Sequence, residues 1–465
     1  MAMATEARVR LSDDPDSALI AGNPSYDAIT EEVSSIVLKR FPPKAWFFFA
    51  FTFAWLLILL YSISYLIAAG IGVWGVNIPV AWGFAITNFV WWIGIGHAGT
   101  LISAILLIMR QHWRNSINRF AEAMTLFAVM CAGMFPLLHL GRPWVFYWLL
   151  PYPDTMGLWP QWRSALVWDA FAVTTYFLVS LIFWYIGLLP DLASMRDRAT
   201  RVAVRKFYGV LALGWLGSAQ QYQRFEMVYL LLGALATPLV VSVHSVVSMD
   251  FAIAQLPGWH STIFPPYFVA GAIYSGFAMV FSLVIPVRAL FKLHNVITQR
   301  HLDYMAYTML VSGLLVSYGY VMEGFDTWVS GSIFDQYMMM NRLFGPYRVA
   351  TWTTLICNVV LPQAAWFRVI RRSTPWLFVI SIIVNIGMWM ERYVIVVTSL
   401  HRDFMPSAWG NYHPTFWDWT VFLGSIGFFL SAMFLFIRLI PAVPMSEVRE
   451  LLDETSKPAP AGGGE

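Results

Sequence analysis

Cysteine is nearly absent from this sequence, and charged side chains are scarce. The 465 residues include only Cys131 and Cys357, and Asp, Glu, Lys and Arg together make up 12% of the chain. An iron–sulfur cluster takes about four cysteine thiolates, so two cysteines exclude such a cluster. No Cys-x-x-Cys-His stretch for covalent haem attachment occurs. We therefore expect no metal site, haem or iron–sulfur cluster in this chain, and any such carrier on a partner chain.

The low charge also excludes an ordinary soluble domain, in which about a quarter of the residues are charged. Hydrophobic residues make up 58% of the chain, and the mean hydropathy is +0.62. Apolar stretches long enough to cross a bilayer recur along it, and each must satisfy its own backbone as a helix. We predict an all-α membrane protein with about ten transmembrane helices at 44–72, 81–109, 117–139, 164–189, 224–251, 265–291, 302–328, 343–370, 375–400 and 416–440.

Basic residues support this topology. All but six of the 29 Lys and Arg fall on one side of the predicted spans, the side that also holds both termini. Basic loops face the cytoplasm, so both termini are expected there. The segment 1–43 has no apolar core of a signal peptide, and the tail 441–465 is expected to be disordered. The net charge of +3 reflects this topology and does not indicate nucleic-acid binding.

A weak internal repeat divides the spans. The motif Arg119-Phe-Ala-Glu122 is paralleled by Arg300-His-Leu-Asp303 at the start of a later span. Within one transmembrane domain, 44–440, we predict two four-helix bundles, about 81–251 and 265–400, with the first and last spans flanking them. The alternative is that the similarity does not reflect a repeat, because basic residues gather in every loop on the inner side and make these loops similar in sequence.

One histidine and two aspartates are expected to lie close together at the outer end of the first bundle. A charge at the centre of the bilayer costs about 3 kcal/mol on insertion scales, so ionisable residues within spans are candidates for function. His139 ends the third span, Asp169 begins the fourth and Asp250 ends the fifth. Their alternative interpretation is structural, as a loop histidine and two helix-capping aspartates.

Deeper ionisable residues suggest a path for protons. Running each span in its predicted direction places His244 about two turns below Asp250, His97 near mid-depth and Glu122 near the inner end. Each histidine is equally compatible with a satisfied core residue, and Glu122 with an i,i+3 pair to Arg119. The sequence leaves the roles of Glu323, Glu391 and Arg392 in the second bundle open.

One glycine-rich motif resembles a dinucleotide-binding sequence but does not indicate dinucleotide binding. Gly94-Ile-Gly96-His-Ala-Gly99 matches the dinucleotide fingerprint G-x-G-x-x-G, but it lies inside an apolar span with no strand before it. Small residues at this spacing let helices approach closely in membranes. The motif therefore predicts tight helix packing.

Several longer motifs carry a family resemblance. Phe135-Pro-Leu-Leu-His139-Leu-Gly-Arg142-Pro-Trp, Trp162-Arg-Ser-Ala-Leu-Val-Trp-Asp169 and His244-Ser-Val-Val-Ser-Met-Asp250 resemble the NrfD/polysulfide-reductase membrane subunits. The run Gly258-Trp-His-Ser-Thr-Ile-Phe-Pro-Pro-Tyr is similar to the longer, ten-span branch of that family. This branch contains the quinol-oxidising membrane subunits of bacterial alternative complex III. The resemblance covers roughly residues 40–440.

The resemblance implies a subunit of a quinol:electron-acceptor oxidoreductase in the bacterial inner membrane. Its quinol, expected to be menaquinol, is bound as substrate at the outer face. The implied partners are an external iron–sulfur subunit, a sister NrfD-like membrane subunit and cytochrome c subunits. Carried over by position, the catalytic residues are His139 and Asp169, with Asp250 and Arg142 also binding quinol, and the proton path contains His97, Glu122 and His244. A histidine is suited to take up quinol protons because it titrates near neutral pH.

Other classes remain open at this point. One is the membrane anchor of a molybdopterin-type oxidoreductase, similar to polysulfide reductase. A dihaem cytochrome b needs facing histidines at matched depths, of which His97 and His244 supply at most one pair. A secondary transporter should show Gly/Pro breaks at corresponding midplane positions of both halves, and we find none.

Overall fold

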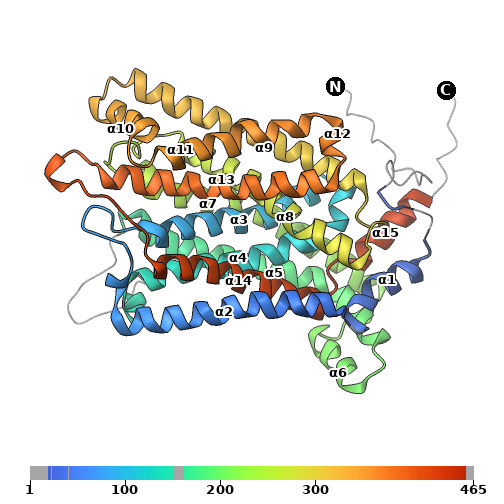
Figure 1. Cartoon of the computed structure of the whole chain (residues 1–465). Helices are drawn as coiled ribbons and strands as arrows, with labels where there is room; N and C mark the ends of the chain where they lie inside the picture. The colour runs from blue at the N-terminus through green and yellow to red at the C-terminus, as the bar shows by residue number, and fades with distance from the viewer. Residues whose placement is uncertain (1–18, 22–23, 40, 150–161, 457–465) are drawn as a thin grey trace, which may run out of the picture.

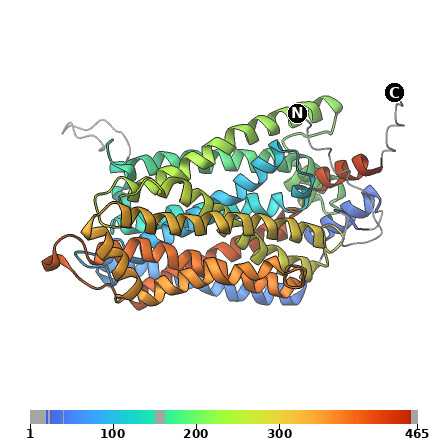
Figure 2. The ribbon, with the colours of Figure 1, turned by 90° about the horizontal axis from the view of Figure 1, so that it is seen from above.

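The protein is a bundle of long helices. The computed structural model describes residues 19–21, 24–39, 41–149 and 162–456, and all regular elements in these ranges are helical. Nine of the described helices are long and apolar enough to cross a membrane, and they run side by side (Figures 1 and 2). They are α2 (Pro43–Ala69), α3 (Gly83–Ile108), α4 (Asn118–His139), α5 (Ala165–Arg198), α7 (Ala219–Ala252), α8 (Phe264–Phe291), α9 (Gln299–Val329), α13 (Thr374–His401) and α14 (Phe416–Leu439). The prediction of a multi-pass, all-α membrane protein is thereby confirmed.

The eighth predicted span, 343–370, is not a single helix. It is divided into α11 (Arg348–Leu355), a π-helical turn (Ile356–Val360), a 3₁₀ segment (Leu361–Trp366) and α12 (Arg368–Arg371). Pro362 has no N–H to continue an α-helical ladder. The segment still runs the height of the bundle, because α11 packs on α13 and Arg371 approaches Asp303 near the start of α9. The described chain thus has nine long helices and one interrupted crossing where ten spans were expected.

Helix α3 lies at the centre of the molecule. It is buried on all sides along most of its length and contacts α4, α7, α8, α13 and α14. Two glycines permit this packing. A Cβ at Gly99 would lie 1.9 Å from the Ala121 carbonyl oxygen of α4, and one at Gly276 of α8 would lie 1.7 Å from the Ala98 Cβ. The Gly94–Gly99 motif therefore serves close helix packing, as predicted.

The helix contacts form two groups that meet along α3 and α8. In the first half α3, α4, α5 and α7 pack on one another, and in the second half α8 and α9 pack with α13 and the interrupted crossing. Helix α2 lies against α14. The remaining described helices are α1 (Tyr26–Leu38), α6 (Val202–Leu211), α10 (Ile333–Phe344) and α15 (Met445–Ser456). The internal sequence repeat itself stays a prediction.

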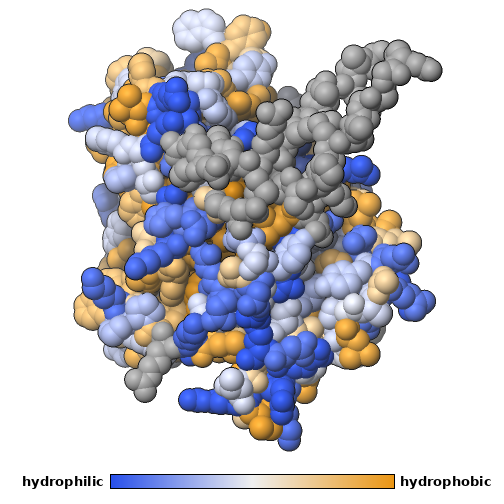
Figure 3. All heavy atoms as spheres, turned by 90° about the vertical axis from the view of Figure 1, so that its right-hand side faces the viewer, coloured by the Kyte–Doolittle hydropathy of each residue, from blue (hydrophilic) through white to orange (hydrophobic). Residues whose placement is uncertain are grey.

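Basic residues gather at one end of the bundle, which we call the basic end. Arg110, Arg198, Lys292 and Arg371 lie there, at or near the ends of α3, α5, α8 and the interrupted crossing, and α1 and α15 contact each other at the same end. Figure 1 shows this end on the right, and Figure 3 shows hydrophilic side chains spread over it. Helix α10 and the loops before α3 and α14 lie at the opposite end.

The expectation of a disordered tail from residue 441 is wrong for its first part. Residues 445–456 form α15, and Val448, Leu451 and Leu452 of this helix are buried. These apolar side chains recur at helical spacing and bury one face of α15. The composition of the last residues, rich in Pro and Gly, concealed this pattern, and residues 457–465 lie outside the described ranges.

Candidate functional site

Two buried aspartates meet at the end opposite the basic end. Asp169 lies in the second turn of α5 and Asp250 near the last turn of α7, and each side chain belongs to a residue that is 7% exposed. Their carboxyl groups are close enough to influence each other electrostatically. Neither oxygen of Asp169 nor Oδ1 of Asp250 has a well-formed hydrogen bond within the described protein. Buried carboxyl oxygens without partners are unusual, and they leave acceptors available to a ligand.

His139 lies at the same end but is not bonded to this pair. It is the last residue of α4, and its ring stacks on Trp74 with a centroid separation of 6.4 Å. Its Nδ1 is buried without a hydrogen-bond partner, whereas Arg142 just beyond it is exposed. No described hydrogen bond joins His139 to Asp169 or Asp250. The predicted cluster therefore consists of two adjacent aspartates and a histidine on the neighbouring helix α4.

His97 and His244 form a second buried pair. The Nδ1 atoms of the two rings are 3.1 Å apart, and His97 Nδ1 also donates to the Ile93 carbonyl at 2.7 Å. Both side chains are at most 1% exposed, and both Nε2 atoms lack a partner. A ligated iron would have to separate the rings, since each iron–nitrogen bond alone takes up about 2 Å. A direct contact between these rings does not fit the paired ligands of a haem.

Hydroxyl groups continue from this pair toward the basic end. The Tyr176 ring of α5 stacks on His97 at 4.5 Å, and its hydroxyl donates to the Gly96 carbonyl at 2.9 Å. One turn further along α3, Thr100 donates to Ser180 at 3.1 Å. One more turn brings Ser103, which donates to Glu122 at 2.5 Å. We call this series, from His244 through His97 and these hydroxyls to Glu122, the polar column.

Glu122 is bonded only to hydroxyl groups. Ser103 and Tyr229 of α7 both donate to its Oε1, the latter at 3.0 Å, and its Oε2 has no partner. The i,i+3 salt bridge between Glu122 and Arg119, which the sequence allowed, does not form. Arg119 instead pairs with Asp191 at 3.1 Å. The predicted span 164–189 ended before Pro190, but α5 continues through this proline to Arg198, and this extension places Asp191 opposite Arg119.

The second half holds a separate buried ion pair. Arg392 Nη1 lies 2.7 Å from Glu391 Oε1, and the Tyr320 hydroxyl donates to Glu391. Asn358 of the π-helical turn donates to Tyr320 at 2.8 Å. Closer to the end with α10, Glu323 pairs with Arg342 at 2.5 Å. Glu323 and Glu391, whose roles the sequence left open, therefore lie in networks of hydrogen bonds and ion pairs, and Glu391 and Arg392 neutralise each other.

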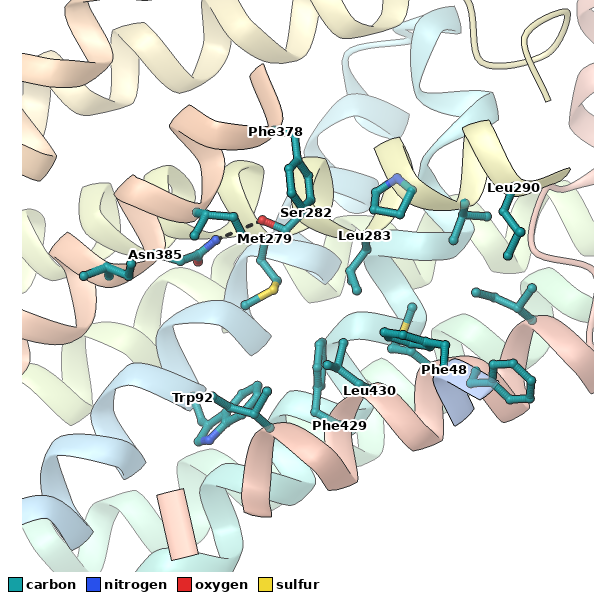
Figure 4. A pocket seen from close by; sticks show the side chains of 18 of the residues that line it. Phe48, Trp92, Met279, Ser282, Leu283, Leu290, Phe378, Asn385, Phe429 and Leu430 are labelled. Atoms are coloured by element: carbon teal, nitrogen blue, oxygen red, sulfur yellow. Dashed lines mark hydrogen bonds between the residues drawn. The ribbon is translucent and has the colours of Figure 1, made fainter. Parts of the chain in front are cut away.

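A large cavity lies apart from all these groups. It has a volume of about 790 Å³ and is bounded by α2, α3, α8, α13 and α14. Figure 4 shows apolar side chains such as Met279, Leu283 and Leu430 around it, with one polar contact, in which Asn385 donates to Ser282 at 3.3 Å. No site residue predicted from the sequence lines this cavity.

Among the described residues, no three His, Cys, Asp or Glu side chains are grouped to hold a metal ion. Cys131 is buried, Cys357 is half-buried, and both are free thiols. The residues that the structure brings together are thus suited to hydrogen bonding and proton exchange.

Known proteins with similar sequences are subunits of reductases and oxidoreductases, two of which are named as membrane subunits. A selenate reductase subunit of Mesobacillus selenatarsenatis is 21% identical over 82% of this chain and 90% of its own length. The Hdr-like menaquinol oxidoreductase integral membrane subunit of Archaeoglobus fulgidus is 20% identical over 84% and 92%. A putative dimethyl sulfoxide reductase membrane subunit of Halobacterium salinarum is 27% identical over 49% and 50%.

The family profile described as "Polysulphide reductase, NrfD" matches residues 72–402, which is more than half of the chain. The match begins before α3 and ends just after α13, so it includes the acid pair, both histidines and the polar column. This chain belongs to the NrfD family of polysulphide reductase-like membrane subunits.

Proposed function

We propose that this chain is the quinol-oxidising membrane subunit of a respiratory complex, with the acid pair Asp169–Asp250 as the group that accepts the quinol protons. In the finer assignment it is the ActC subunit of a bacterial alternative complex III. The basic end faces the cytoplasm of a cell with this chain in its inner membrane, and the acid pair lies at the outer face.

The unpartnered oxygens of the acid pair carry this proposal. A quinol has two hydroxyl groups, and its oxidation releases two protons and two electrons. Each hydroxyl needs an acceptor in a site that is screened from bulk water. Asp169 offers two buried oxygens and Asp250 one, without competing hydrogen bonds. Two adjacent carboxyl groups can hold one proton or two, as proton release requires.

His139 supplies a further base beside the pair. Its Nδ1 is buried without a partner, and the stacked Trp74 fixes the plane of the imidazole ring. A histidine changes charge near neutral pH. We propose that one quinol hydroxyl bonds to His139 and the other to Asp169, with Asp250 sharing the proton and Arg142 at the rim of the site.

The electrons leave through a partner. The described part of this chain contains no grouped metal ligands, so the electrons pass to an iron–sulfur subunit docked on the outer face. A site at that end of the helices keeps the transfer distance short. A sister NrfD-like subunit and cytochrome c subunits complete the proposed assembly.

Two of the named relatives support two related assignments. One is a subunit of a menaquinol oxidoreductase, which favours menaquinol as the substrate, and another is a subunit of a selenate reductase. The second candidate function is therefore the membrane subunit of a molybdopterin-type reductase. The quinol chemistry of this chain is the same in both assignments, and only the soluble partners differ.

The polar column is proposed as a proton path. It contains three bonded pairs at successive depths along α3: His97 with His244, Thr100 with Ser180, and Ser103 with Glu122. Proton transfer along it links the quinol site at one face with the basic end at the other.

Purification of the complex from its native membrane tests the assignment. Alternative complex III predicts co-purification of a second NrfD-like chain, an iron–sulfur subunit and c-type haem, together with menaquinol oxidation. Co-purification of a molybdopterin subunit selects the reductase assignment, and a chain isolated without redox partners contradicts both.

A further inference from the structure

Five buried charged residues meet at the basic end of the polar column. We call them the inner charge cluster: Arg114, Arg119, Glu122, Asp191 and Glu447. Each of these residues is at most 7% exposed. Four of them come from α4, α5 and the 3₁₀ segment His112–Ser116, whereas Glu447 is on the C-terminal helix α15. A helix outside the membrane-spanning bundle thus contributes a charge to the path.

Glu447 is fixed in the cluster by several bonds. Its Oε2 lies 2.8 Å from Arg114 Nη2, and Asn118 Nδ2 donates to its two carboxylate oxygens at 3.1 and 3.2 Å. Asn115 donates to the Glu447 carbonyl at 3.2 Å, and the Ser446 N–H donates to Asp191 at 3.0 Å. The first turn of α15 is therefore anchored on the bundle by its polar groups.

The two ion pairs of the cluster use two of its three carboxyl groups, and Glu122 is not part of either pair. Arg119 is matched by Asp191 and Arg114 by Glu447. Glu122 has only the hydroxyls of Ser103 and Tyr229 as partners. A proton from water at the basic end can bind the Glu122 carboxylate, make it a neutral carboxylic acid and later leave along the column. The net charge changes by one in this step, and neither arginine loses its partner.

Arg114 is close enough to disturb this arrangement. Its guanidinium carbon lies 6.0 Å from the ring centroid of Tyr229, whose hydroxyl binds Glu122. Its Nη1 has no hydrogen bond, and neither has Glu122 Oε2. A buried charge that loses its partner is strongly unfavourable. Without Glu447, Arg114 would take Glu122 as its counter-ion and hold it as a carboxylate.

We propose that α15 is a positioning element of the proton path, and that Glu447 keeps Glu122 free for proton exchange by holding Arg114. This inference rests on the proposed proton path through Glu122. Among the described residues, Tyr229 and Tyr222 of α7 also lie near the cluster, and Arg449 of α15 lies near Tyr222. None of these three groups is a carboxylate, so none of them can replace Glu447 as the counter-ion of Arg114.

The test uses the intact complex in sealed proteoliposomes, with quinol oxidation and proton movement measured together and normalised to the redox cofactor content. Glu447→Gln is expected to slow both by roughly 10- to 100-fold, which is less than the usual cost of about 10²- to 10⁴-fold for losing the proton-transfer group itself. Glu447→Asp keeps the charge and is expected to retain most of the rate. Glu226→Gln, an exposed residue at the same end, is the matched control and should have no effect.

The double variant Arg114→Gln/Glu447→Gln separates positioning from structural support. Because it removes the arginine that would capture Glu122, it should recover rates close to wild type, whereas a purely structural role predicts rates no better than those of Glu447→Gln. If the double variant does not recover, Glu447 does not act by holding Arg114. A normal rate in Glu447→Gln while Glu122→Gln is inactive contradicts the inference too. In both cases the proton path through Glu122 remains supported. A normal rate in Glu122→Gln removes the path and the inference together.

Discussion

His97 Nδ1 lies 3.1 Å from His244 Nδ1, although 147 residues separate them in the chain. The contact joins α3 to α7 in the interior of the first half of the molecule, below the acid pair and above the hydroxyls that continue to Glu122. The two side chains are buried, and each retains a ring nitrogen without a partner. This pair is the link on which the proposed proton path depends.

Breaking this link should impair proton-coupled turnover. His244→Gln is expected to lower quinol oxidation by about 10²-fold or more, which is typical for the loss of a positioned proton-transfer group. Because both rings act in one series, His97→Gln/His244→Gln should be little worse than either single variant. Steady-state quinol oxidation by the assembled complex measures both. His260→Gln, at an exposed position, is the control, and strictly additive losses would contradict a serial path.

The orientation of the chain gives a second prediction. Ile78, in the loop before α3, is 98% exposed, and Arg201 is exposed at the basic end. In a background with both native cysteines replaced by alanine, Ile78→Cys should react with a membrane-impermeant thiol reagent in spheroplasts. Arg201→Cys should react only in inverted vesicles. The reverse pattern would place the acid pair on the cytoplasmic side and refute the proposed orientation.

Helix packing at the centre can be tested at Gly276. A Cβ there would come within 1.7 Å of the Ala98 Cβ, whereas a Cβ at Gly133 of α4 meets nothing within 4 Å. Gly276→Ala should therefore separate α8 from α3 and destabilise the protein by about 1–3 kcal/mol, the usual range for overpacking. Gly133→Ala should be neutral or slightly stabilising, since alanine favours helix. Thermal denaturation in detergent compares the two, and equal losses would speak against the tight contact.

The Arg119–Asp191 pair should be important for stability. Both side chains are 1% exposed, so Asp191→Asn would leave a buried arginine without its counter-charge, at a cost of about 3–5 kcal/mol. The pair Arg196–Asp197 on the same helix is the comparison, with Asp197 65% exposed. Asp197→Asn should cost at most about 1 kcal/mol. Unfolding temperatures of the purified variants would reveal the difference, and a stable Asp191→Asn protein would show that Arg119 has another partner.

The sequence predicted most helices because each must be apolar over its full length. It also predicted that Asp169 and Asp250 come together, since alternating helix direction places the start of α5 beside the end of α7. It missed Asp191 because Pro190 was taken as a helix end, although the helix continues through it. It missed the hydroxyls of Tyr176 and Tyr229 because an aromatic residue in a membrane helix is usually an apolar contact. Glu447 was hidden in a segment whose composition predicts disorder.

The most direct test of the account is the rate of quinol oxidation by the assembled complex carrying Asp169→Asn. The amide keeps the shape of the side chain but cannot take up a proton, so the rate should fall by about 10²- to 10⁴-fold. His139→Ala should cause a comparable loss and Asp250→Asn a smaller one, with normal assembly and iron–sulfur spectra in each. Asp326→Asn, at an exposed position near the same end, should leave the rate unchanged. Near wild-type oxidation by both Asp169→Asn and His139→Ala would contradict the account and move the quinol site to another subunit.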